Sequence, residues 1–198
     1  MSSPEVPPQI GALRVLIAED ETLIRMDLVE TLVELGFVIT AAVANGQAAV
    51  DSALREPPDV VLMDISMPVR DGISAAEQII GSGIAPVVML SAFTDVGLLD
   101  RAASAGVFGY LVKPFRAPEL APALLMAVSR WKEFSELGAE IEQLRARKEA
   151  TSTVERAKSI LMAQGLTEEQ SFGMLRRMAM DSRQTISEVS AQVVATER

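Results

Sequence analysis

The chain has 198 residues, of which 18 are Lys or Arg and 27 are Asp or Glu, and it contains neither Cys nor His. These counts exclude disulfides, thiolate catalysis, Cys- or His-based zinc sites and any imidazole mechanism, and they leave carboxylate, lysine and hydroxyl chemistry with hard cations. With 49% hydrophobic residues and no apolar run long enough to span a membrane, we expect a cytoplasmic protein of one large or two small domains, without a membrane partner.

Residues 1–11 are rich in Pro and Ser and carry neither the basic segment nor the apolar segment of a secretion signal. Segments of this composition order poorly unless something ties them down. We therefore expect residues 1–11 to form a flexible tail that precedes the fold.

Short apolar runs alternate with amphipathic stretches through residues 12–132. The runs lack the alternation of half-buried strands, which is typical of parallel strands covered on both faces. The runs lie at residues 15–18, 37–44, 60–63, 86–90 and 107–112, and the amphipathic stretches at 22–35, 47–55, 73–81, 96–105 and 118–130. This pattern predicts an α/β fold with a five-stranded, parallel, doubly wound sheet that has helices on both faces.

The strand pattern ends near residue 132, and residues 133–153 predict a coiled helical linker. Apolar residues recur there at spacings of three and four, at Phe134, Leu137, Ile141 and Leu144. This spacing gives a helix a seam that can pair with another helix.

Residues 154–198 predict a small, three-helix, all-α domain. Gly165 is of the residue type that commonly ends a helix. Two segments, 167–170 and 185–188, each begin with Thr and carry Gln or Glu three residues later, which marks the start of a helix. A helical domain of this size gains stability from a partner or from dimerisation.

Charge divides the chain along the same line. Residues 1–138 hold 9 basic and 18 acidic side chains and residues 139–198 hold 9 of each, so the net charge of −9 arises in the first part. The basic residues of the second part include Arg156, Lys158, Arg176 and Arg177. Two interpretations stay open, because these side chains either neutralise nucleic-acid phosphates or pair with glutamates on a solvated helical face.

Charged and hydroxyl side chains lie where the predicted strands end, at Glu19, Asp20, Asp64, Ser91 and Lys113. Because the carboxyl ends of parallel strands meet at one edge of a sheet, we expect these side chains to converge. Carboxylates this close repel one another unless a cation lies among them, and Mg²⁺ is the natural cation here. A carboxylate nucleophile, a metal, an ammonium and a hydroxyl predict a site for phosphoryl transfer onto an aspartate.

Two segments carry a resemblance to a known family. Asp64-Ile-Ser-Met-Pro-Val-Arg-Asp-Gly72 resembles the phosphorylation loop of two-component response-regulator receiver domains, and Tyr110-Leu-Val-Lys-Pro114 resembles the end of their fifth strand. The resemblance covers about residues 12–132 and implies a flavodoxin-like receiver domain. It further implies that Asp64 accepts a phosphoryl group from a sensor histidine kinase, and that the protein is not an enzyme beyond Mg²⁺-dependent self-dephosphorylation.

The same resemblance implies a role for each residue of the site. Mg²⁺ would be bound by Glu19, Asp20, Asp64 and the backbone carbonyl of Ser66. Lys113 and Ser91 would hold oxygens of the phosphoryl group, and Tyr110 would turn inward as a switch. Glu19 replaces the aspartate that the family more often has at this position, which keeps the charge and alters the geometry.

These residues also have simpler interpretations. An isolated Asp at the end of a strand is usually a helix cap or a turn residue, and a lone Tyr on the last strand is more often a core residue. Lys113 precedes Pro114, which favours an extended backbone that aims the lysine at the cluster and makes a cis peptide bond plausible.

The C-terminal helices resemble a second family. Residues 154–162, 165–172 and 175–180 resemble the ANTAR family of RNA-binding output domains, over about residues 138–198, although Ser159 and Ser171 stand where that family usually has Gly and Ala. Combined with a receiver, the resemblance implies a phosphorylation-dependent transcriptional antitermination regulator. It would bind paired RNA hairpins, as a homodimer when active, and its candidate RNA contacts are Arg156, Lys158, Arg176 and Arg177.

Three other functions stay open at this point: a DNA-binding response regulator, a Mg²⁺-dependent hydrolase that uses the aspartate for turnover, and a protein-interaction adaptor. No predicted helix carries a dense cluster of base-reading side chains, and no helix-turn-helix spacing is visible. Both observations argue against the DNA-binding alternative.

Overall fold

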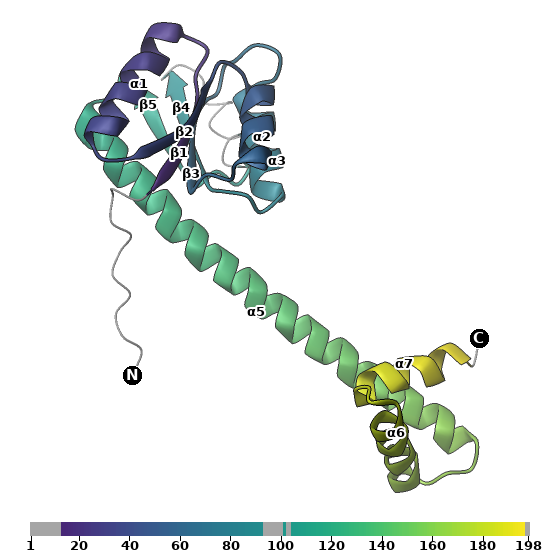
Figure 1. Ribbon diagram of the computed structural model, residues 1–198. Helices are drawn as coiled ribbons and strands as arrows, with labels where there is room; N and C mark the ends of the chain where they lie inside the picture. The colour runs from purple at the N-terminus through teal and green to yellow at the C-terminus, as the bar shows by residue number, and fades with distance from the viewer. Residues whose placement is uncertain (1–12, 93–100, 102–103, 197–198) are drawn as a thin grey trace, which may run out of the picture. The chain divides into compact units, whose positions relative to one another are not determined.

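The computed structural model describes residues 13–92, 101 and 104–196 (Figure 1). The chain divides into two compact units, residues 1–134 and residues 135–198, and each is described separately below. The predicted tail at residues 1–11 lies outside the described residues, and so do residues 96–100, 102 and 103 of the helix predicted at 96–105.

One five-stranded sheet forms the centre of the first unit. Its strands have the order β2-β1-β3-β4-β5, and every neighbouring pair is parallel. The strands are β1 (Arg14–Ala18), β2 (Val38–Val43), β3 (Val60–Asp64), β4 (Val87–Ala92) and β5 (Gly109–Lys113). This arrangement confirms the predicted parallel sheet, and β3 is buried along its whole length, as the absence of alternation predicted.

Helices cover both faces of this sheet (Figure 1). Helices α2 (Gly46–Arg55) and α3 (Gly72–Gly81) pack on one face, where their apolar side chains share a core with Leu16 and Met63. Helix α1 (Thr22–Glu34) and the first turns of α5 (Ala117–Ala163) pack on the other face, in a core with Ile17 and Leu62. Successive side chains of a strand therefore pack into the cores on opposite faces of the sheet, and the doubly wound fold is confirmed.

Three helical segments build the second unit. Helix α5 ends at Ala163, and Gly165 follows it with φ +96°, the left-handed conformation that ends many helices. At the start of α6 (Glu168–Ser182), the Gln170 amide N–H donates to Thr167 Oγ1 (3.2 Å) and the Thr167 amide N–H donates to Gln170 Oε1 (2.9 Å). The predicted capping box is confirmed.

The core of the second unit is small. It joins Ala157 and Leu161 of α5, Leu175 and Ala179 of α6, and Val189 of α7 (Ile186–Thr196). The apolar seam predicted on the linker lies outside this core, since Phe134, Leu137, Ile141 and Leu144 are each at least 50% exposed. None of the helices in the described part of the chain combines the length and the hydropathy that a membrane span requires.

Candidate functional site

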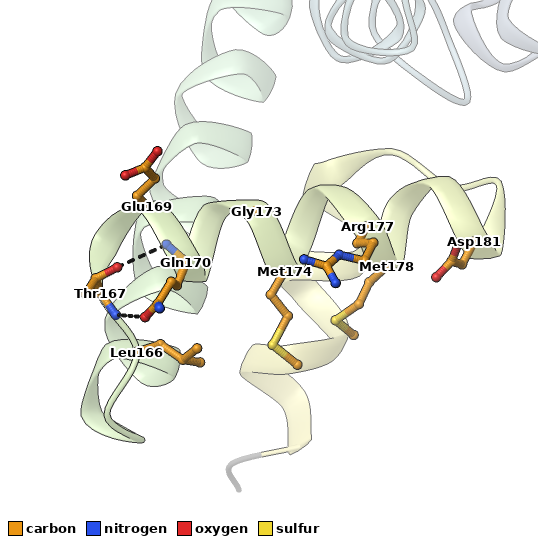
Figure 2. A pocket seen from close by; sticks show the side chains of 9 residues that line it. All are labelled: Leu166, Thr167, Glu169, Gln170, Gly173, Met174, Arg177, Met178 and Asp181. Carbon is orange, nitrogen blue, oxygen red and sulfur yellow. Dashed lines mark hydrogen bonds between the residues drawn. The ribbon is translucent and has the colours of Figure 1, made fainter.

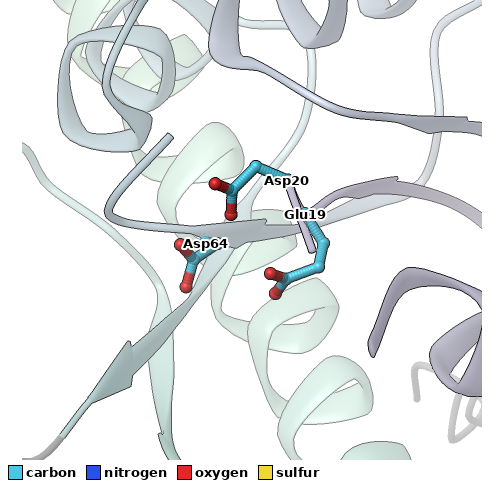
Figure 3. A group of neighbouring side chains, drawn as sticks. All are labelled: Glu19, Asp20 and Asp64. Carbon is cyan, nitrogen blue, oxygen red and sulfur yellow. The ribbon is translucent and has the colours of Figure 1, made fainter. Parts of the chain in front are cut away.

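Three carboxylates gather at the carboxyl edge of the sheet (Figure 3). Glu19 and Asp20 directly follow β1, and Asp64 is the last residue of β3, the strand that pairs with β1. Each of the three offers an oxygen atom, and these oxygens lie within 4.8 Å of one another. The structure therefore brings together the acidic residues that the sequence predicted at the strand ends.

Lys113, the last residue of β5, joins two of these carboxylates. Its Nζ lies 2.7 Å from Glu19 Oε2 and 2.7 Å from Asp64 Oδ1. The lysine and Glu19 are 94 positions apart in the chain, so only the sheet topology brings them together. The Lys113–Pro114 peptide bond is cis, as the sequence made plausible.

Burial shifts the pKa values of the charged groups in this cluster. Glu19 is fully buried; burial raises the pKa of its carboxyl, the hydrogen bond from Lys113 opposes the rise, and the nearby Asp64 charge adds to it. Burial lowers the pKa of Lys113, but its hydrogen bonds to Asp64 and Glu19 outweigh that effect and leave the pKa above its usual value. One ammonium cannot neutralise three carboxylates, and the all-oxygen donor set fits a hard divalent cation such as Mg²⁺.

The loop after β3 holds Asp64 in a fixed frame. The Ser66 amide N–H donates to Asp64 Oδ2 (3.0 Å), and the Gly72 amide N–H donates to the Ile65 carbonyl (2.9 Å). A Cβ atom at Gly72 would lie 1.9 Å from the Asp64 carbonyl oxygen, so this position admits only glycine. The hydrogen bond of Ser66 uses its N–H, and its carbonyl stays the predicted metal ligand.

Asp71 starts the helix that follows this loop. Its Oδ1 accepts a hydrogen bond from the Ser74 amide (3.1 Å) and its Oδ2 accepts one from the Ser74 hydroxyl (2.7 Å). Burial raises the pKa of Asp71, but the bonds from Ser74 outweigh it and leave the pKa below its usual value. Asp71 therefore anchors the far end of the loop to α3 as its N-cap.

Arg25 on α1 fixes the other acidic loop, and sequence reasoning missed it. Its Nη1 donates to the Glu19 carbonyl (2.6 Å) and to the Asp20 carbonyl (3.2 Å). No motif marked this residue, because its partners are backbone atoms five and six positions earlier. Its contribution is to hold the turn that presents both carboxylates.

Ser91 and Tyr110 lie on neighbouring strands. Ser91 is buried near the end of β4, and its hydroxyl donates to the Ala92 carbonyl (3.1 Å). Tyr110 on β5 is 60% exposed, so its ring lies outside the core.

A groove opens beside Lys113, and sequence reasoning missed it as well. It lies between the start of α1 and the segment after β5, and Leu23 in it is 82% exposed. Apolar residues occur on both sides of α1, so periodicity gave no signal for an exposed apolar site. The groove is lined by Glu21, Leu23, Ile24, Asp27, Lys113, Pro114 and Phe115.

The four basic residues proposed from the sequence differ in their surroundings. Arg156, Arg176 and Arg177 are exposed on α5 and α6. Lys158 instead lies 2.6 Å from Glu168 Oε1 and 3.1 Å from Glu155 Oε1, with only 12% of its side chain exposed. Its hydrogen bonds to Glu168 and Glu155 raise the pKa of Lys158, so this ammonium already has anionic partners within the protein.

Comparison with known proteins gives two family matches. Residues 15–125 match the response regulator receiver domain, and residues 142–194 match the ANTAR domain. The transcriptional regulatory protein PdtaR of Mycobacterium tuberculosis H37Rv is 48% identical over 184 residues, which cover 92% of this chain and 90% of that protein.

Solved structures resemble the first unit. The receiver domain of a modulated diguanylate cyclase from Desulfovibrio desulfuricans G20 is 32% identical with a TM-score of 0.58, and the alignment covers 61% of this chain and 97% of that one. The receiver domain of the Pseudomonas aeruginosa sensor histidine kinase PA1611, which holds a magnesium ion in its active-site cleft, is 34% identical with a TM-score of 0.54, over 60% and 98% of the two chains. The chain therefore belongs to the two-component response regulators, with a receiver domain followed by an ANTAR domain.

Proposed function

We propose that Asp64 accepts a phosphoryl group from a sensor histidine kinase, and that the phosphorylated protein binds paired RNA hairpins and promotes transcription antitermination. One observation carries the proposal: the Lys113 ammonium bridges the buried carboxylates Glu19 and Asp64, in a chain whose residues 142–194 match the ANTAR domain. A buried lysine and carboxylates at strand ends make a site for anionic oxygens.

Mg²⁺ is the cofactor that we assign to this site. Glu19, Asp20, Asp64 and the backbone carbonyl of Ser66 would hold it, since three of these groups already converge. When bound, the ion supplies the positive charge that neutralises the carboxylates and the oxygens of the incoming phosphoryl group. Arg25 keeps the loop of Glu19 and Asp20 in place through its bonds to their carbonyls.

The transfer step uses Asp64 as the nucleophile. A carboxylate oxygen of Asp64 attacks the phosphorus of an N-phosphohistidine; the P–O bond forms as the P–N bond breaks, and the electron pair stays on the imidazole nitrogen of the kinase, which then takes a proton from water. Lys113 would bind one phosphoryl oxygen through its ammonium, and the Ser91 hydroxyl would donate a hydrogen bond to another. Both donors lie at the ends of neighbouring strands.

The groove beside Lys113 is the docking site that we propose for the kinase. Leu23, Ile24 and Phe115 give it an apolar surface, and Lys113 connects it to Asp64. A kinase helix that packs its apolar side chains on this surface would present its phosphohistidine to Asp64. The exposure of Leu23 supports this assignment, because a large exposed apolar side chain on a helix is available for a partner.

Phosphorylation would shift a population of conformations. The phosphoryl group adds a charge of about −1.5 to −2 and draws Ser91 and Lys113 toward it. The exposed Tyr110 would then turn inward behind Ser91, which changes the surface of β5. We propose that this favours homodimers, paired through the exposed α5 seam formed by Phe134, Leu137, Ile141 and Leu144.

The RNA contacts that we propose are Arg156, Lys158, Arg176 and Arg177. The three arginines are exposed and can neutralise phosphates or stack on unpaired bases. Lys158 would first have to leave Glu168, so we assign it a smaller contribution.

Hairpin binding with and without phosphorylation tests this function. The probe is a pool of short RNA hairpins with one GC-rich stem and randomised loops, titrated in the presence of acetyl phosphate and Mg²⁺. We expect tighter binding by the phosphorylated protein and no such gain for Asp64→Asn. Equal affinities for both states of the wild type would contradict the switch.

A further inference from the structure

The loop after β3, which follows Asp64, contains a strained turn at Val69. Val69 has φ +68°, in the left-handed region that β-branched residues rarely occupy. The Arg70 amide N–H donates to the Pro68 carbonyl (2.7 Å), so a hydrogen bond between residues two apart closes the turn. A turn of this kind with a positive φ is strained, and it persists only where the surrounding structure imposes it.

The Val69 side chain does not compensate for this strain. It is 86% exposed, and no large apolar side chain in the described part of the chain is more exposed. The side chain therefore buries almost no apolar surface in return. The conformation of Val69 must be imposed by its neighbours in the chain.

The residue after Val69 is attached to two helices. The Arg70 carbonyl accepts a hydrogen bond from the Gly46 amide N–H at the start of α2 (3.2 Å). The Arg70 guanidinium donates to two groups of α3, the Ser74 carbonyl (2.7 Å) and Gln78 Oε1 (2.6 Å). These bonds fix the backbone on the far side of the turn.

The chain before Val69 is restricted as well, and it leads back to the proposed metal ligand. Met67 is buried in the core that α2 and α3 form with the sheet, and as the residue before a proline it is confined to extended conformations. The ring of Pro68 fixes its φ. The Ser66 carbonyl is therefore joined to Val69 by a segment with little backbone freedom.

We infer that Val69 is a positioning residue for Mg²⁺, whose strained turn holds the Ser66 carbonyl in the direction needed to bind the ion. The inference rests on the proposed function and adds to it a residue that is not itself a ligand. A β-branched residue at positive φ has a narrow range of allowed backbone angles, so the ligand is oriented before Mg²⁺ binds. A glycine would fit the same turn without strain, but it would also allow many other conformations.

The test is Val69→Gly, because it should move stability and Mg²⁺ affinity in opposite directions. Relief of the strain exceeds the entropy cost of a glycine, so the thermal midpoint of the Mg²⁺-free first unit, followed by Trp131 fluorescence, should rise by about 3 °C. The Mg²⁺ dissociation constant of the full chain, measured by isothermal titration calorimetry, should rise about threefold, because the looser loop must be ordered on binding. Loss of a residue that only supports the fold would lower both stability and affinity.

Two further readouts separate positioning from chemistry. The Mg²⁺ concentration for half-maximal labelling of Asp64 by acetyl phosphate should rise about threefold in Val69→Gly. The rate at saturating Mg²⁺ should match the wild type, because Asp64, Lys113 and Ser91 are unchanged. Without Mg²⁺, the Arg70 amide should exchange its hydrogen faster in Val69→Gly, since its bond to the Pro68 carbonyl is no longer enforced.

Two other variants complete the design. Val69→Ile is the conservative replacement, which keeps the branched side chain and should retain the wild-type affinity for Mg²⁺. A matched site lies in the second unit, where α6 begins at the capping box of Thr167 and Gln170 (Figure 2) and ends at Arg183, a non-glycine residue with φ +55°. Arg183→Gly also removes a side chain from positive φ, but it should leave the Mg²⁺ dissociation constant unchanged.

Three results would overturn the inference. A wild-type Mg²⁺ dissociation constant in Val69→Gly would separate the turn from the metal site and leave the proposed function standing. A lower thermal midpoint in Val69→Gly, or weaker Mg²⁺ binding in Arg183→Gly as well, would mean that the loss does not come from the strained turn. Absence of both Mg²⁺ binding and Asp64 labelling in the wild type would remove the proposed function together with the inference.

Discussion

The two units differ in the burial of the charged residues that we assign to function. The first unit buries Glu19 completely and leaves Asp64 only 6% exposed, and it brings Lys113 to both of them across the sheet. The second unit leaves Arg156, Arg176 and Arg177 on the surface of its helices. In the first unit the fold itself creates the site, so its chemistry follows from topology. In the second unit these three arginines are exposed on single helices, whereas Lys158 of α5 pairs with Glu168 of α6.

Replacement of Gly72 should have the largest effect, because it tests how tightly the first unit frames its site. A Cβ atom at this position would overlap the Asp64 carbonyl, so Gly72→Ala should lower the free energy of unfolding by about 4 kcal/mol. Urea denaturation followed by Trp131 fluorescence measures the change, because Trp131 contacts Phe108 in the same unit. The control Gly81→Ala, at a glycine with open space, should be nearly neutral; a similar loss in both variants would contradict the close approach.

Replacement of Lys113 should have the next largest effect. Lys113→Met keeps the length of the side chain but leaves Glu19 and Asp64 without their ammonium partner, which should destabilise the first unit by about 3 kcal/mol at neutral pH. Added Mg²⁺ should restore part of this loss in the variant. An unchanged free energy of unfolding without Mg²⁺ would show that the carboxylates do not depend on the lysine.

Removal of the Glu19 charge should stabilise the first unit in the absence of Mg²⁺. Because the pKa of Glu19 is raised in the folded protein, the folded state binds its proton more tightly than the unfolded chain, and stability is lost as the pH rises above the ordinary pKa of 4.5. Glu19→Gln should therefore be more stable than the wild type at about pH 7, and the difference should shrink toward about pH 4. A variant less stable than the wild type at neutral pH would reverse the sign of the argument.

Removing one helix N-cap in each unit compares the two units directly. Asp71→Ala and Thr167→Ala each remove an N-cap side chain and should each cost about 1 kcal/mol in their own unit. The chain has a single Trp, in the first unit, so only Asp71→Ala should shift the fluorescence transition. A fluorescence shift in Thr167→Ala would indicate that the units unfold together.

The loss of stability in Asp71→Ala should also become smaller in acid. The ionised Asp71 cap stabilises the fold above the ordinary pKa of 3.8, and this contribution is lost as the pH falls through the lowered pKa of Asp71.

The smallest effect is expected at Lys158. Lys158→Gln should weaken hairpin binding less than about twofold, because the ammonium already pairs with Glu155 and Glu168. Arg177→Gln is the matched comparison and should lose about tenfold. The reverse order would place the RNA on the α5 side of the second unit.

The sequence predicted more of the first unit than of the second. The continuous apolar run at β3 predicted a buried strand, and the position of Asp64 at its end predicted the acidic cluster. Patterns along the chain could not predict that Gly72 approaches the Asp64 carbonyl, or that Arg25 holds the loop of Glu19. Both contacts involve backbone atoms, whose positions depend on the finished loop.

The second unit shows the same limit at a helix crossing. The sequence places Glu155 near Lys158 on the same helix, but it could not show the shorter ion pair of Lys158 with Glu168, which belongs to the next helix. The capping box at Thr167, in contrast, is local, and it was predicted correctly. Residues close in sequence therefore predicted where a helix begins. Which basic side chains form ion pairs depends on how the helices pack, and the sequence did not predict that.

The most direct test of the central claim is the position of the phosphoryl group. The full chain is incubated with acetyl phosphate and Mg²⁺, the acyl phosphate is reduced with borohydride to mark its site, and the peptides are examined by mass spectrometry. The account predicts a label on Asp64 that requires Mg²⁺ and is lost in Asp64→Asn. A label at another carboxylate, or an unlabelled Asp64 under these conditions, would contradict it.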